Sequence, residues 1–222
     1  MDSSLETRSV GLRDRQKQER ERRIVKAAKR LFARKGYAEV AMEDVAAHAS
    51  LAVGTIYNYF PSKSALLLAI VRRETESLLA RGRKILDDPP GDAVAAACSF
   101  TEIFLDDFTR DDRRLWRELF GAAIADPSVV GRRLFEGDAR LVSQLAALLE
   151  QYRGNGVLAS DMEPLPAATV IYGVCFTWMT AYLMNEQISA DMVRHEIRRG
   201  TAIAMRGLFP QAEAIITGGD KL

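Results

Sequence analysis

The sequence predicts an all-α protein of about nine helices, in which a small N-terminal helix-turn-helix module precedes a larger helical domain. Apolar residues recur at the helical period in almost every segment, and no useful stretch alternates as a strand does. Of the 222 residues, 48% are hydrophobic and 27% are charged, so a sizeable core can be buried.

The first helix is expected from about residue 13 to Lys35, with Gly36 ending it. Its first half is polar on every side and must extend beyond the core, and residues 1–12 are expected to form a disordered arm. Its second half carries an apolar face at helical spacing, made of Ile24, Ala27, Ala28, Leu31 and Phe32.

Two short helices follow, joined by about three residues. The first begins near Met42, with two acidic residues in its first turn, where the helix dipole favours them. The second ends at Phe60, because the residue before Pro61 is pushed out of the helical region. Short helices joined by so tight a turn form a helix-turn-helix, and residues 13–61 are the predicted module.

The rest of the chain is also predicted to be helical. Ser62 can cap a linking helix over residues 62–86, and "DDPPGD" at 87–92 is the clearest break in the chain. A second domain is expected over residues 87–210, followed by a frayed tail over 211–222. Its helices are expected at about residues 92–109, 112–125, 128–153, 166–186 and 189–208.

Charge is distributed unevenly along the chain. Up to Arg73 there are 15 basic and 8 acidic residues, a net charge of +7, whereas the remainder carries −6. A basic front end points to a polyanion or an acidic membrane surface as partner. The run "RDRQKQERERR" at 13–23 also contains acids, which is more typical of a solvated helix face than of a DNA-binding arm.

Residues 53–63 have the features of a helix that enters the major groove of DNA. Such a helix needs an apolar back, polar groups for base edges and donors for phosphates. Ile56 and Phe60 should face inward, and Gly54 lets the backbone approach the duplex closely. Lys63 is placed to meet a phosphate with its ammonium group and with the free N–H groups of its helix. The remaining surface is covered by Thr55, Tyr57, Asn58 and Tyr59.

Residues 20–67 resemble the DNA-binding domain of the tetracycline-repressor (TetR) family. The resemblance rests on "AAKRLFARKGY", "MEDVAAHAS" and "GTIYNYFPSKSALL". It implies a homodimeric, all-helical transcription regulator whose C-terminal domain binds a small effector and pairs its last two long helices with those of a second subunit. It also implies backbone contacts by Tyr59 and Lys63, and base-edge contacts by Val53, Gly54, Thr55, Tyr57 and Asn58.

Two positions depart from the family pattern. Ala41 stands where a hydroxyl-bearing N-cap is usual, a loss of about 1 kcal/mol unless Glu43 or a neighbour compensates. Ser50 stands where glycine is usual in the turn, so strain or a left-handed serine is expected there.

Aromatic residues gather in the middle helices. Most belong to a packed core, since aromatic stripes at helical spacing usually do. The resemblance implies that some of them border an apolar effector cavity, namely Phe104, Phe108, Trp116, Phe120, Tyr172, Phe176 and Met179.

The span from Leu165 to Asn185 contains no charged residue and is long enough to raise the question of a membrane helix. Pro166, three threonines and acidic flanks without a nearby lysine or arginine favour a buried helix, so no membrane partner is expected. Because this helix is apolar all round, it should contact both its own domain and a second subunit.

The sequence thus predicts a ligand-responsive transcriptional regulator of the repressor type, a homodimer on a palindromic double-stranded DNA operator, released by a small, largely apolar effector. A cytoplasmic location is expected, since the N-terminus lacks a secretory signal. No enzyme is expected, because GxSxG, GxGxxG, HExxH and P-loop motifs are absent.

Neither a metal nor another cofactor is expected, because Cys98 and Cys175 lie far apart and only two histidines accompany them. The alternative is a sequence-independent nucleoid or membrane-surface protein, for which the basic front end alone would suffice.

Overall fold

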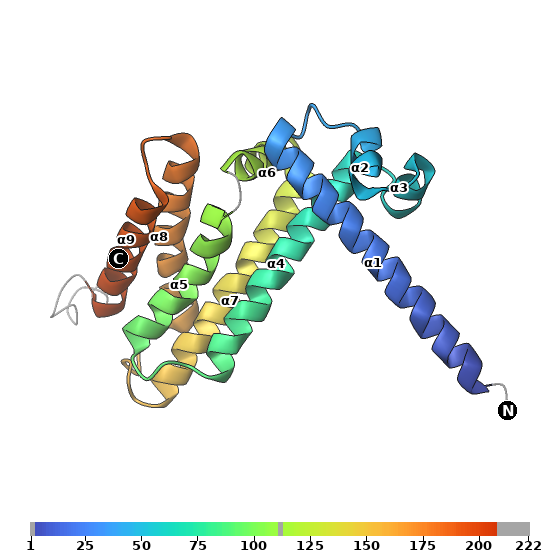
Figure 1. Ribbon diagram of the computed structural model, residues 1–222. Coiled ribbons are helices and arrows are strands. Elements are labelled where there is room, and N and C mark those ends of the chain that lie inside the picture. The colour runs from blue at the N-terminus through green and yellow to red at the C-terminus, as the bar shows by residue number, and fades with distance from the viewer. Residues whose placement is uncertain (1–2, 111–112, 208–222) are drawn as a thin grey trace, which may run out of the picture. The chain divides into compact units, whose positions relative to one another are not determined.

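The computed structural model describes residues 3–110 and 113–207, and within these ranges it contains helices and no strand. The described residues form nine α-helices and one π-helical turn, η1, and Figure 1 labels the α-helices. They are α1 Ser3–Lys35, α2 Met42–Ala49, α3 Val53–Tyr59, α4 Lys63–Asp87, α5 Ala93–Arg110, α6 Arg113–Ala125, η1 Pro127–Gly131, α7 Arg132–Gly154, α8 Pro164–Met184 and α9 Ala190–Arg206. The predicted all-α fold class is confirmed.

Two helix boundaries differ from the sequence expectation. Helix α1 begins at Ser3, so most of the segment expected to be a disordered arm is helical. This segment has no proline, and it continues without a break into the run at 13–23, which is rich in arginine, glutamine and glutamate and favours helix propagation. Helix α7 begins later than expected, because the π-helical turn precedes it and Asp126 caps that turn by accepting the Val129 N–H at 3.0 Å.

The chain separates into two compact units, residues 1–77 with 108–138 and residues 78–107 with 139–222. The first unit contains α1, α2, α3, the first part of α4, and α6. Each of its first four helices buries the apolar face that its spacing predicts. The fully buried side chains of this core include Ile24, Ala28, Phe32, Ile56, Leu66 and Ile70.

The C-terminal end of α1 is held by α6 within the first unit. Arg114 on α6 donates to the carbonyls of Arg34 and Lys35 at 3.1 and 2.5 Å. Gly36 ends α1 with φ of 91°, and a Cβ at this position would come within 2.6 Å of the Arg114 guanidinium. Glycine is therefore favoured here by its conformation, whereas the Arg114 side chain could move away from a Cβ.

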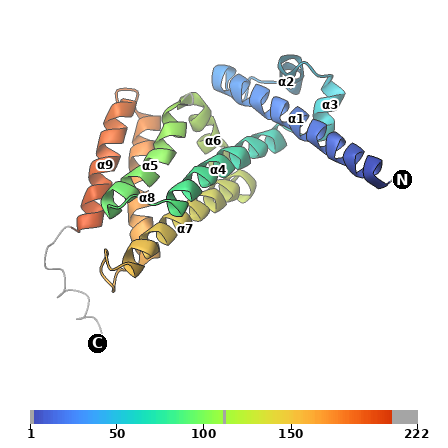
Figure 2. The same cartoon turned by 60° about the horizontal axis from the view of Figure 1, so that its bottom comes forward.

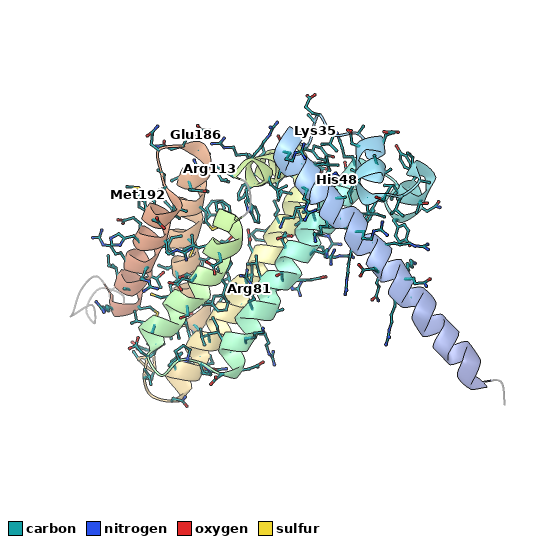
Figure 3. The ribbon with its side chains drawn as sticks, in the orientation of Figure 1. Lys35, His48, Arg81, Arg113, Glu186 and Met192 are labelled. Atoms are coloured by element: carbon teal, nitrogen blue, oxygen red, sulfur yellow. The ribbon has the colours of Figure 1, made fainter. Side chains whose placement is uncertain are left out.

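The second unit packs α5, α8 and parts of α4 and α7 around one apolar core. That core includes Leu79, Phe100, Leu145, Leu148 and Ile171. Arg81, labelled in Figure 3, donates from the middle of α4 to the Ile103 carbonyl at 3.0 Å. Figure 2 shows α8 and α9 side by side, and Gly200 permits this approach because a Cβ there would lie 2.5 Å from Val174 Cγ1.

Helix α8 is buried on one side only within its own chain, and the contact of its other side with a second subunit stays a prediction. Ala168, Ile171 and Cys175 face the core. Val170 and Met184 are 60% and 81% exposed. Within the described part of the chain, α8 alone is long and apolar enough to cross a membrane. The exposed residues on one side, the α8 stripe, are Leu165, Thr169, Val170, Gly173, Phe176, Thr177 and Met184.

Candidate nucleic-acid interface

The turn between α2 and α3 has the conformation that the sequence predicts. Ser50 is left-handed, with φ of 53° and ψ of 52°, and it is the one non-glycine residue with positive φ among those described. The Leu51 N–H donates to the Ala46 carbonyl at 3.0 Å and closes the end of α2. The left-handed conformation destabilises a non-glycine residue by about 1–2 kcal/mol. The tight turn is therefore strained at Ser50.

The missing cap of α2 is partly replaced. Ala41 offers no side-chain acceptor, but Asp44 accepts the Ala41 N–H at 3.0 Å and the Lys35 ammonium at 3.2 Å. These two hydrogen bonds, the backbone one foremost, lower the pKa of the Asp44 carboxyl below its usual value. Asp44, rather than Glu43, thus supplies the hydrogen bond back to the N-cap residue, while no side chain caps the first turn from position 41.

Helix α3 presents two different faces. Ile56 is fully buried, and Phe60, which follows the helix, is buried with it. Gly54 and Asn58 are exposed, and Tyr57 is 46% exposed. Val53, Thr55 and Tyr59 are half-buried at the margins. The underside thus fixes the helix to the first unit and the opposite side is free for a partner.

Lys63 is the site residue whose surroundings differ most from the expectation. Its ammonium group donates to the carbonyls of Tyr37, Ala38 and Val40 at 2.7, 3.1 and 3.0 Å. It also lies 4.6 Å from the centre of the Tyr37 ring. A lysine has three donors, and all three are used here. The ammonium therefore pins the loop between α1 and α2, and the expectation that it meets a phosphate needs correction.

The N–H groups at the start of α4 remain suited to an anion. Ser62 caps this helix by accepting the Ala65 N–H at 3.1 Å. Lys63 is the first residue of the helix, and N–H groups in the first turn lack partners within a helix. The backbone of Lys63, rather than its ammonium, is thus the better candidate for a phosphate contact.

The predicted effector residues fall into two groups, one in each unit. In the first unit, the rings of Phe108 and Trp116 lie 5.1 Å apart, and Phe120 belongs to the same unit. In the second, Tyr172 lies 5.9 Å from Phe104 and 6.3 Å from Phe176, and Met179 is on the same helix. A cavity bordered by all seven residues stays a prediction.

The first unit also carries cationic residues that the motif did not include. Arg23 donates to the Ala49 carbonyl at the end of α2, at 2.6 Å. A cleft of about 270 Å³ beside it is lined by Lys26, Arg30 and His48, the last of which is labelled on α2 in Figure 3. Sequence reasoning treated the run at 13–23, which ends at Arg23, as a solvated face and did not single out the other three residues, because spacing on one helix does not show which second helix completes a cleft.

An exposed polar helix on a buried apolar underside, set by a tight turn from the helix before it, defines a helix-turn-helix DNA-binding protein. Residues 24–70 match the family model of bacterial regulatory proteins of the tetR family. The HTH-type transcriptional repressor KstR of Rhodococcus jostii (strain RHA1) is 31% identical over 182 residues, which cover 78% of this chain and 77% of KstR. The chain belongs to the TetR family, whose members are transcriptional regulators and not enzymes.

Solved structures share the fold at lower identity. The fatty acid degradation regulator FadR of Bacillus halodurans has a TM-score of 0.70 at 18% identity, covering 85% of this chain and 96% of FadR. Thermus thermophilus FadR, a TetR family repressor solved with lauroyl-CoA, has a TM-score of 0.66 at 21% identity, covering 88% and 98%. The predicted family and the predicted function of a transcriptional regulator of the repressor type are confirmed.

Proposed function

We propose that the chain binds a palindromic DNA operator as a homodimer and that α3 reads the major groove. The observation that carries this proposal is the exposed polar side of α3 above a buried underside. Tyr59 and the backbone at Lys63 are proposed to hold phosphates. The proposed contacts to base edges are made by Val53, Gly54, Thr55, Tyr57 and Asn58.

The basic front end supports DNA as the partner. Residues up to Arg73 carry a net charge of +7, which attracts the phosphate backbone and accelerates association. A dimer would place its two α3 helices in successive major grooves, about 34 Å apart. A sequence-independent nucleoid protein would share the charge, but it would not need an exposed reading helix. We propose that this binding takes place in the cytoplasm and represses transcription, as in the related repressor KstR.

The homodimer is proposed to form through the α8 stripe. The stripe contains no charged side chain and lies on one side of a 21-residue helix whose other side is buried in its own unit. Apolar surface of this kind is costly to leave in water. A two-fold interface places the same stripe on both partners, which suits a flat surface of small and apolar residues.

The effector is proposed to be small and largely apolar. The aromatic residues of both units support this class, because ligand sites are lined mainly by apolar and aromatic side chains. Since T. thermophilus FadR holds lauroyl-CoA, acyl-CoA thioesters are the first compounds to test. An effector coupled to DNA binding by about 1–3 kcal/mol would lower operator affinity by about 5- to 150-fold.

In vitro selection of bound duplexes tests operator recognition. Asn58→Ala is expected to cost about 1–3 kcal/mol per half-site on the selected duplex and to relax the base preference there. Asn155→Ala, an exposed asparagine in the turn after α7, is the matched control and should bind as the wild type does. Equal binding of the wild type to every duplex would overturn the proposal in favour of a nucleoid protein.

The effector class is tested on the selected duplex. Acyl-CoA thioesters of increasing chain length are added to the complex, with free coenzyme A as the control. Release by the long-chain thioesters alone would support an apolar effector. Release by coenzyme A alone, or by none of these compounds, would exclude this class and leave operator recognition in place.

A further inference from the structure

A groove of about 600 Å³ lies beside the reading helix within the first unit. Helix α3 contributes Asn58 and Tyr59 to it, α4 contributes Arg72, and the start of α7 contributes Arg133. Its remaining wall is the polar front half of α1, which lines it with Lys17 and Glu21. Figures 1 and 2 show α1 extending beyond α2 and α3, which leaves this part of the helix free to form a groove.

The groove is cationic, but its cations differ in availability. The Arg72 guanidinium donates to Glu21 at 2.9 Å. Arg133 donates to Glu136 at 3.0 Å. Lys17, in contrast, has no hydrogen bond or ion pair within the described residues. One exposed ammonium group is therefore available to an anion, beside two arginines whose charges are balanced by Glu21 and Glu136.

The position of the groove favours a polyanion that is continuous with the bound operator. Asn58 and Tyr59 belong both to the groove and to the proposed DNA contacts of α3. A phosphodiester backbone carries one negative charge per nucleotide, so a strand that leaves the reading helix can place its next phosphates along the groove. The groove is also lined by the apolar side chains of Phe60, Ala65, Leu68 and Ala69, so the assignment to a phosphate rests on the Lys17 ammonium and on the continuity with α3.

We infer that this groove holds the sugar–phosphate backbone that flanks each operator half-site, and that Lys17 contacts a phosphate there. The inference rests on the proposed operator binding. It explains why the front half of α1 is helical yet polar on every side, because its partner is a charged strand rather than a protein core. Lys17 then adds affinity without adding sequence preference.

Two duplexes test the inference, namely the selected operator alone and the same operator extended by one helical turn, about 10 base pairs, at each end. On the extended duplex, Lys17→Ala should reduce the slope of log K against log [salt] by about 0.9 per subunit. The loss of affinity between 50 and 200 mM salt then becomes about threefold smaller per subunit. On the short duplex, wild type and variant should have the same slope.

Lys84→Ala is the matched control, because it removes the same charge from an exposed lysine of α4 in the second unit. It should leave both slopes unchanged. Thermal unfolding of Lys17→Ala should match the wild type, since Lys17 has no partner to lose among the described residues. Equal slopes of wild type and Lys17→Ala on the extended duplex would overturn the groove assignment. A wild type without preference for the selected operator would instead overturn the proposed function.

Discussion

At the scale of the residue, the stability of the folded chain does not explain why position 54 is a glycine, Gly54. It is exposed on α3, and a Cβ added to it would meet no atom within 4 Å. Glycine in a helix interior costs about 1 kcal/mol relative to alanine. Its presence is therefore better explained by a partner that approaches the helix backbone closely than by packing within the protein.

Gly54→Ala is expected to raise the free energy of unfolding by about 1 kcal/mol and to weaken operator binding, because the added methyl group stands where the duplex approaches. Urea denaturation and fluorescence anisotropy with a labelled operator measure the two effects. Gly121→Ala is the matched control, since Gly121 is also an exposed helical glycine with open space around it. Gly121→Ala should stabilise the fold and leave the affinity for the operator unchanged. An unchanged operator affinity of Gly54→Ala would contradict the close approach of the duplex to α3.

At the scale of the element, the orientation of the helix-turn-helix depends on contacts that tie its loops to its helices. Lys63 joins the start of α4 to three carbonyls that lie 23 to 26 residues earlier in the chain. Asp44 joins α2 to the end of α1 through Lys35. These contacts add to the apolar core that α1, α2 and α3 share, and they fix the loops that connect these helices.

Lys63→Met keeps an apolar stem and removes the ammonium, which leaves three carbonyls without their donor. The free energy of unfolding is expected to fall by about 1–3 kcal/mol, the usual cost of unsatisfied partly buried acceptors. The salt dependence of operator binding should stay unchanged, and both quantities are compared with those of Lys84→Met. If Lys63→Met instead reduced the salt dependence of operator binding and left the free energy of unfolding unchanged, the Lys63 ammonium would be assigned to a phosphate contact after all.

At the scale of the whole molecule, the exposed α8 stripe is an apolar surface that a partner would shield from water. The structure leaves Val170 and Phe176 in water along a helix without charges, whereas Cys175 on its other side is buried so completely that the pKa of its thiol rises to about 12. Helix α8 thus has a core side and a side for a partner, which agrees with the proposed dimer.

Gly173→Arg is expected to convert the dimer to a monomer. Gly173 lies in the middle of the stripe with open space above it, so arginine fits the monomer but puts a charge into the interface. Sedimentation velocity measures the change. Gly154→Arg, at an exposed helical glycine outside the stripe, should remain dimeric. A dimer that persists in Gly173→Arg would place the interface elsewhere.

Much of this protein could be predicted from the sequence, because the signals are local. Helical periodicity located nearly every helix and the inward positions Ile56 and Phe60. The family pattern, in which glycine is usual at position 50, led to the expectation of a left-handed Ser50. The start of α1 was placed late, because a polar helix without an apolar face has no periodicity to mark its beginning.

The sequence by itself determined the helices, the helix-turn-helix and the family. Only the tertiary structure decided where the Lys63 ammonium is bound, which cations line the groove with Lys17, and which side of α8 is left exposed. The first two depend on residues that are distant in the chain and meet only after folding. The third has no signal in the sequence, because a helix that is apolar all round shows no difference between its faces until its neighbours pack against it.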